Sequence, residues 1–174
     1  FIGLAWWALD FPFMRRYSAG YLKKYPHRKG KDIDITRKAC EKYRYLPVTI
    51  MNFLEGTRYT SEKYHQQQSQ YRHLLSPKAG GLAFALSSMN GQLHQLLDVT
   101  IVYPDGCPGM LQYLAGRVKR VQVHVRTLPI SDTLLGDYQQ DPIFREHFQT
   151  WVNQLWQEKD QRIEQMLQAS TNSR

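Results

Sequence analysis

The residues best suited to chemistry lie at a glycine turn between an apolar run and a polar run. From Thr49 to Arg58 the chain reads Thr-Ile-Met-Asn-Phe-Leu-Glu-Gly-Thr-Arg, so a carboxylate and a guanidinium flank a glycine directly after a β-prone segment. Glycine allows a tight bend or a close backbone approach to a ligand, and arginine offers a planar fork that suits phosphate. The alternative is an ordinary strand-ending turn with a surface Glu–Arg pair.

Composition limits the partners without choosing among them. At 174 residues the chain can bury roughly 70% of its unfolded surface in one domain. Its formal charge of +8 favours phospholipid head groups, nucleic acid, phosphorylated metabolites or an acidic carrier protein. Cys40 and Cys107 have no metal or redox spacing and are expected to be reduced thiols, with a single disulfide as the alternative. The six histidines are scattered without ligand spacing, so no metal site is expected.

The first part of the chain is apolar and then basic. Residues 1–9 contain Trp6 and Trp7 and are predicted to pack on the core or to enter a bilayer interface. A short strand over 11–14 leads into a basic, tyrosine-rich segment, 15–31, which is either a solvated loop or a contact for anionic lipid or an acidic protein. No signal peptide or run long enough to span a membrane is visible. The chain begins with Phe1, and we expect it to be a piece of a longer protein.

The remaining pattern alternates helices and strands, which is typical of an α/β domain. Asp141 and Pro142 are predicted to start the longest helix, and the valines at 121–125 alternate with polar residues as in a half-exposed strand. The predicted elements are helix 37–45, a strand ending at Phe53, helix 61–71, a loop at 77–81 opening a helix through Leu86, strand 98–104, helix 108–115, strand 121–126 and helix 141–167.

Three stretches together resemble the glycerolipid (lysophospholipid) acyltransferase family. Phe53–Arg58 is similar to the family's F-P-E-G-T-R block, with Leu54 where proline is usual. Phe13–Arg16 is similar to its upstream F-I-x-R block. Pro77–Gly81 is similar to the P-K-x-G-G loop of the branch that resembles 1-acylglycerol-3-phosphate acyltransferases. The three stretches occur in the family's order.

The resemblance implies a fold and a reaction. The fold is α/β, a single domain with a central mixed β-sheet flanked by helices, in which 1–174 is a partial acyltransferase domain. The motif-bearing core is expected at about 1–135 and a C-terminal helix at about 141–167. The reaction is transfer of an acyl chain from acyl-CoA or acyl carrier protein to 1-acylglycerol 3-phosphate (lysophosphatidic acid), giving phosphatidic acid for phospholipid biosynthesis. No other cofactor is implied. The expected location is a membrane surface, the cytoplasmic face of a bacterial inner membrane.

The resemblance also implies the roles of individual residues. The two arginines would hold the glycerol phosphate, a lysine would be a third cation, and the other motif residues would shape the acceptor site. The implied substrate-binding residues are Arg16, Glu55, Gly56, Thr57, Arg58 and Lys78. The family's catalytic N-H-x-x-x-x-D block, in which His is the general base and Asp orients it, would precede Phe1, so this chain alone is expected to be inactive.

His27 and Cys107 are two further residues that could carry catalysis. His27 and Asp32 satisfy H-x-x-x-x-D by spacing, but they follow Pro26 and come after the F-I-x-R-like block, which favours an exposed loop. Cys107 stands just before a predicted helix and could serve as the nucleophile of a thiol hydrolase, provided that a histidine lies close in space.

A non-catalytic alternative rests on the basic segment 15–31. Tyrosines interleaved with cations suit stacking on single-stranded nucleic acid or contact with anionic lipid. No recognised nucleic-acid motif accompanies them, and the apolar start favours a membrane. We therefore expect lipid, acyl thioester and possible carrier-protein partners, and no nucleic acid.

Overall fold

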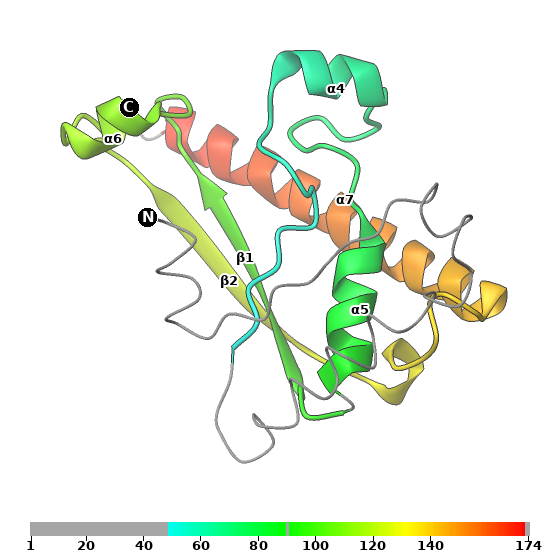
Figure 1. The fold of residues 1–174 in the computed structure, drawn as a ribbon. Helices are drawn as coiled ribbons and strands as arrows, with labels where there is room; N and C mark the ends of the chain where they lie inside the picture. Colours follow the sequence, from blue (N-terminus) through cyan, green and yellow to red (C-terminus); the bar gives the residue numbers. More distant parts are fainter. Residues whose placement is uncertain (1–48, 90, 173–174) are drawn as a thin grey trace, which may run out of the picture.

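The structure, a computed structural model, describes residues 49–89 and 91–172. Two strands and a long C-terminal helix form its frame, with shorter helices at the ends (Figure 1). In chain order the elements are α4 (Ser61–Gln67), α5 (Ala79–Met89), β1 (Gln95–Val102), α6 (Met110–Leu114), β2 (Gln122–Pro129), the 3-10 helix η3 (Asp132–Leu134) and α7 (Pro142–Asn172).

Several predictions concern residues outside this description. They are the apolar segment 1–9, the strand 11–14, the basic segment 15–31 and the helix 37–45. Arg16, His27 and Cys40 lie in these segments, and their predicted roles stay predictions.

Strands β1 and β2 form an antiparallel ribbon with α7 along one face (Figure 1). Asp98 lies opposite Arg126 and Val99 opposite Val125. The face of the ribbon toward α7 carries Asp98, Thr100 and Val102, whereas six aliphatic side chains in or next to the strands lie on the other face and are 45–58% exposed. These exposed side chains are Leu97, Val99, Ile101, Val121, Val123 and Val125.

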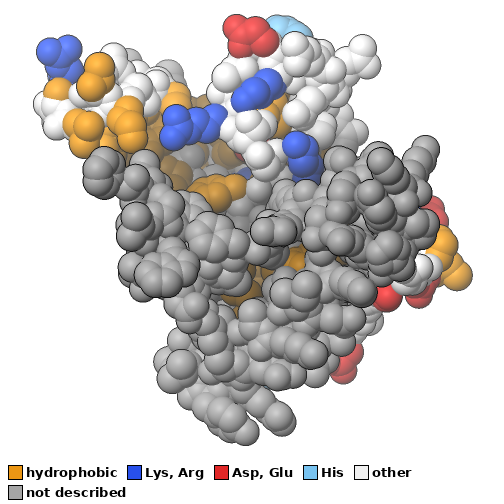
Figure 2. Space-filling model, viewed as in Figure 1, with side chains coloured by type: hydrophobic (Ala, Val, Ile, Leu, Met, Phe, Trp, Pro, Cys, Tyr) orange, Lys and Arg blue, Asp and Glu red, His pale blue; other side chains and the backbone are white. Residues whose placement is uncertain are grey.

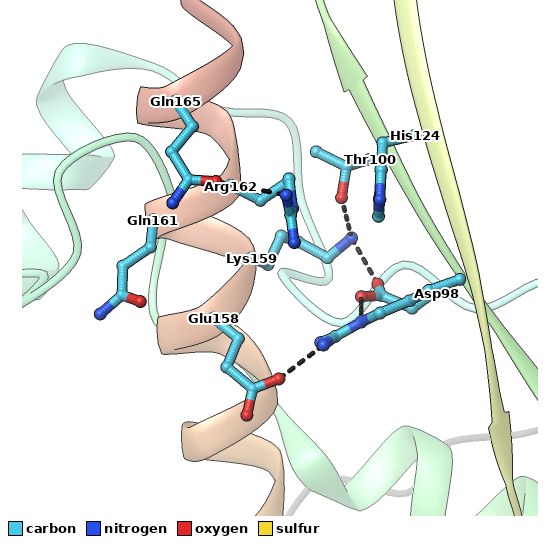
Figure 3. A pocket seen from close by; sticks show the side chains of 9 residues that line it. Asp98, Thr100, His124, Glu158, Lys159, Gln161, Arg162 and Gln165 are labelled. Carbon is cyan, nitrogen blue, oxygen red and sulfur yellow. Dashed lines mark hydrogen bonds and ion pairs between the residues drawn. The ribbon is translucent and has the colours of Figure 1, made fainter.

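A buried lysine explains why the polar face turns inward. Lys159 of α7 places its Nζ 2.5 Å from Asp98 Oδ1 and donates to Val99 O at 2.8 Å and to Thr100 Oγ1 at 3.1 Å (Figure 3). Arg126 Nε donates to the other oxygen of Asp98 at 2.8 Å. Since unpaired buried charges are costly, the carboxylate and the ammonium hold the ribbon against the helix in this orientation.

The apolar core lies between α5 and the first half of α7. Phe148 and Val152 are fully buried, and Asp141 Oδ1 caps α7 by accepting from the N–H groups of Ile143 and Phe144. The capping by Asp141 and the apolar stripe of this helix confirm the prediction. The buried core residues are Ala79, Leu82, Ala83, Leu86, Leu134, Phe148 and Val152.

Three predicted elements differ most from the observed ones. Residues 49–53 form no strand, since Met51 is 78% and Phe53 77% exposed and this segment pairs with no described strand. Helix α4 stops four residues before Tyr71 because Gln68 adopts a left-handed conformation. Helix α7 continues to Asn172, past the predicted end at 167.

The described residues match the predicted α/β fold with a central mixed sheet only in part. Helices and strands in one unit are compatible with the α/β class, but the described residues contain one two-stranded antiparallel sheet. A mixed sheet would need further strands, and the strand expected to end at Phe53 does not form over the described residues 49–53.

Replacing Lys159 by methionine tests the ion pair that orients the ribbon. Lys159→Met leaves Asp98 buried opposite an apolar side chain and should lower the free energy of unfolding by about 3–5 kcal/mol in urea denaturation. The control is Arg120→Gln, which removes an ion pair with Asp105 whose partners are each 38% exposed. That control should change stability little. Equal losses in both variants would contradict the role given to Lys159.

Candidate functional site

Gly56 closes a tight turn at the centre of the acyltransferase-like motif. Its N–H donates to Phe53 O at 2.9 Å, and its φ of +66° lies in the left-handed region that favours glycine. A Cβ added here would lie 3.2 Å from Lys78 Cδ. Glycine is therefore required by both the backbone conformation and the closeness of the lysine.

Lys78 brings the second motif onto the first. Its backbone N–H donates to Leu54 O at 2.7 Å, and its side chain passes over Gly56, with Nζ 3.5 Å from where a Cβ would stand. The loop resembling P-K-x-G-G and the block resembling F-P-E-G-T-R therefore lie side by side. Gly80 and Gly81 of the same loop begin α5 rather than forming an open loop.

Lys63 is a further cation at this turn, which the sequence analysis did not single out. Its Nζ donates to Thr57 Oγ1 at 2.6 Å and to Arg58 O at 3.3 Å. It lies in the first turn of α4, whose N-cap Thr60 accepts from the Lys63 N–H at 3.3 Å. The sequence could have indicated Lys63 through its position just after the predicted helix start. A side chain in the first turn of a helix points back toward the N-terminus, here over the preceding turn.

The guanidinium of Arg58 is exposed and has no ion-pair or hydrogen-bond partner within residues 49–89 and 91–172. The turn thus combines this open guanidinium with the ammonium groups of Lys63 and Lys78. Such a group of donors and positive charge can bind a phosphate or a carboxylate.

Glu55 points away from these cations. The surface Glu–Arg pair, which was the alternative interpretation of this turn, does not form in the described part of the chain. Burial raises the pKa of the Glu55 carboxyl above its ordinary value of 4.5, opposed by a hydrogen bond from the Leu75 N–H and by the charge of Lys159. One of its oxygens, Oε2, is buried without a hydrogen-bond partner. Glu55 therefore anchors the turn toward α7 and leaves the cationic side open.

Helix α7 also holds the segment behind the turn. Asp160 accepts from the N–H groups of Arg72 and His73 at 2.9 and 2.8 Å, and Trp156 Nε1 donates to Leu75 O at 2.8 Å. Trp156 and Asp160 lie about one helical turn apart on the same face of α7. The helix that orients the ribbon therefore also positions the motif turn.

A polar hollow of about 240 Å³ lies between α7 and the ribbon, and it is a poorer candidate for a phosphate (Figure 3). Lys159 and Arg126 are both paired with Asp98, and Arg126 also pairs with Glu158 at 2.5 Å. Arg162 donates to Gln165. Most of the positive charge in the hollow is already neutralised, unlike that at the motif turn.

Cys107 shows none of the surroundings that the thiol-hydrolase hypothesis needs. Its thiol is free and exposed. It lies three residues before α6, and no hydrogen bond joins it to a histidine in the described ranges. The roles of Arg16 and His27 are not tested, since neither residue is described.

Gly56→Ala tests whether the lysine must lie over the turn. The matched control is Gly116→Ala, because Gly116 has the same φ of +66° but nothing within 4 Å of an added Cβ. Each variant should lose about 1–2 kcal/mol of stability from the left-handed backbone. Only Gly56→Ala should also weaken the binding of a phosphate monoester, by about tenfold, because it displaces Lys78. Calorimetric titration measures this; equal affinities would contradict the arrangement.

Glu55→Gln tests the buried carboxyl. Since its pKa is raised in the folded state, the proton it binds contributes stability that is present below pH 4.5 and is lost as pH rises through the folded pKa. Urea denaturation over a pH series should show a flatter decline in stability for Glu55→Gln than for the wild type.

Glu62→Gln is the control of opposite sign. The Glu62 N–H and the Thr60 side chain lower the pKa of Glu62, so this exposed carboxylate adds stability above pH 4.5 that is lost as pH falls. If the two variants shift the pH profile in the same direction, the assignment for Glu55 is wrong.

Comparison with known proteins identifies relatives of one kind. The chain is 26% identical over 141 residues to an uncharacterized acyltransferase of Schizosaccharomyces pombe, covering 70% of this chain and 37% of that protein. It is 25% identical over 163 residues to lysocardiolipin acyltransferase 1 of Mus musculus, covering 84% and 41%. It is 25% identical over 157 residues to 1-acyl-sn-glycerol-3-phosphate acyltransferase 2 of Arabidopsis thaliana, covering 80% and 38%.

These matches have clear limits. No family model and no solved structure matches the chain. The chain spans less than half the length of the relatives named above. Those relatives come from eukaryotes, so they give no support to the predicted bacterial inner membrane. All three relatives are named as acyltransferases, and they support the resemblance to the glycerolipid acyltransferase family that the adjoining motifs at Leu54 and Lys78 carry.

Proposed function

We propose that this chain is the acceptor-binding part of a lysophospholipid acyltransferase that acts on 1-acylglycerol 3-phosphate. The observation that carries the proposal is the group of three cationic residues at the Gly56 turn. Arg58 presents a guanidinium without a partner in the described residues, the Lys63 ammonium donates to Thr57, and the Lys78 side chain lies beside Gly56.

The charge of the acceptor fits this group. A phosphate monoester carries between one and two negative charges near neutral pH and offers three acceptor oxygens, as a phosphorylated side chain does. A phosphodiester has lower charge and fewer free oxygens, so it would use the cations less fully. The names of the relatives include both lysocardiolipin and 1-acyl-sn-glycerol-3-phosphate acyltransferases, and the cation group favours the monoester.

The chemistry of acyl transfer needs groups beyond this turn. The acceptor hydroxyl must lose a proton to a general base, and the thioester carbonyl needs donors where negative charge develops. We propose that a His–Asp pair supplies the base and that the motif turn fixes the acceptor beside it. The acyl donor is a thioester of coenzyme A or of acyl carrier protein, and the reaction takes place at a membrane surface.

Arg58→Ala tests the acceptor site, in the chain joined to whatever natural sequence precedes it. Loss of a charge-assisted hydrogen bond to phosphate should lower kcat/KM for 1-acylglycerol 3-phosphate by about 10- to 100-fold, mainly through KM. The control is Arg72→Ala, since Arg72 is exposed but pairs with Glu164 at 3.1 Å. His27→Ala should hardly matter.

Three results would count against the proposal. One is an equal effect of Arg58→Ala and Arg72→Ala on acyl transfer. Another is an equal effect of Arg58→Ala on acceptors with and without a phosphate. Loss of activity in His27→Ala alone would overturn the motif assignment and locate the base on that loop.

A further inference from the structure

The connection between β1 and β2 exposes an apolar helix at the end of the ribbon. We call residues 103–121 the α6 tip. None of the residues of α6 is buried. Four of them are apolar and largely exposed: Met110 at 69%, Leu111 at 81%, Tyr113 at 61% and Leu114 at 74%. An apolar cluster of this kind in water marks a surface that another phase or molecule covers.

The α6 tip has a defined shape even though no residue of its helix is buried. Arg120 Nε and Nη2 donate to the two oxygens of Asp105 at 3.1 and 2.6 Å and close its base. The Gln112 side chain accepts from the Gly109 N–H at 3.0 Å, and Gly116 ends the helix in a left-handed conformation. The apolar side chains are therefore held together on a built projection.

Apart from Asp105, which pairs with Arg120, the charged side chains of the α6 tip are all positive. From Gly106 to Ser131 the chain contains no aspartate or glutamate. Arg117 and Lys119 follow α6 directly and are exposed. Figure 2 shows hydrophobic side chains gathered over α6 next to Lys and Arg side chains. Apolar residues with a cationic border and an interfacial tyrosine match the order of layers at an anionic membrane surface.

We propose that the α6 tip inserts into the interface of a bilayer containing anionic lipid. Leu111 and Leu114 enter the boundary of the acyl chains, Tyr113 lies at the head groups, and Arg117 and Lys119 contact lipid phosphate. The α6 tip lies at the opposite end of the molecule from the start of α7, so it projects where a flat surface can reach it (Figure 1).

The inference extends the proposed function, since a lysophospholipid acceptor is met at a lipid surface. It does not depend on acyl transfer, because membrane binding is measured with no substrate present. Loss of catalysis in Arg58→Ala with normal vesicle binding, or the reverse, separates the two proposals.

Vesicle co-sedimentation of the full chain is the first test. Leu111→Ser combined with Leu114→Ser should lower the partition coefficient onto phosphatidylcholine–phosphatidylserine vesicles by about tenfold or more. The matched control is Ile143→Ser, because Ile143 is also 81% exposed but lies in the first turn of α7. Lys119→Gln should weaken binding to these vesicles about fivefold and leave binding to pure phosphatidylcholine vesicles unchanged. Arg162→Gln should leave binding to both kinds of vesicle unchanged.

A fluorescent probe gives an independent measurement. With Cys40 and Cys107 replaced by serine, an environment-sensitive dye is attached through Leu111→Cys or, as the control, through Ile143→Cys. Only the dye at position 111 should move its fluorescence emission to shorter wavelength when vesicles are added. Only this dye should be quenched by nitroxide-labelled lipid. Since no residue of α6 is itself buried, the tip variants should keep the wild-type melting temperature.

The proposal is overturned if the paired leucine variant binds vesicles as the wild type does, or if Ile143→Ser loses as much binding. It is also overturned if the dye at position 111 stays in water while the protein is bound. The last result would assign membrane binding to another segment and leave the α6 tip for a protein partner.

Discussion

The ion pair between Lys159 and Asp98 is the contact on which the rest of the described structure depends. It joins the middle of α7 to the middle of β1 at 2.5 Å, with both side chains less than 10% exposed. A buried pair is not an efficient source of stability, because desolvation offsets much of the attraction. Its effect is orientation, since turning the other face of the ribbon toward α7 would leave the Lys159 ammonium against aliphatic side chains without its carboxylate partner.

The same helix determines the geometry of the candidate acceptor site. Trp156 and Asp160 hold the backbone of residues 72–75, and the Leu75 N–H in turn holds Glu55. Glu55 is thereby drawn inward, and the other residues of the motif turn face outward. A carboxylate among the three cations would compete for phosphate, so its inward position keeps the turn available for an anion.

The orientation of the ribbon has a second consequence at its outer face. Because the polar side of β1 and β2 packs on α7, the aliphatic side of Val99, Val123 and Val125 is left exposed. The alternation of residues 121–126 indicated a strand with two unlike faces, but it did not say which face would be buried. For a half-exposed strand the usual expectation is an apolar buried face. Here the partner helix contributes Lys159 at the contact and reverses that expectation.

The sequence by itself determined the features that depend on neighbours along the chain. Asp141 and Pro142 start α7, Gly56 bends the motif turn, and the period of apolar residues gives the core stripe, since each follows from local backbone chemistry. Tertiary structure alone decided that the Lys78 side chain lies over Gly56 and that the Leu75 N–H holds Glu55. These arrangements depend on side chains brought together from distant segments, and no local spacing encodes such contacts.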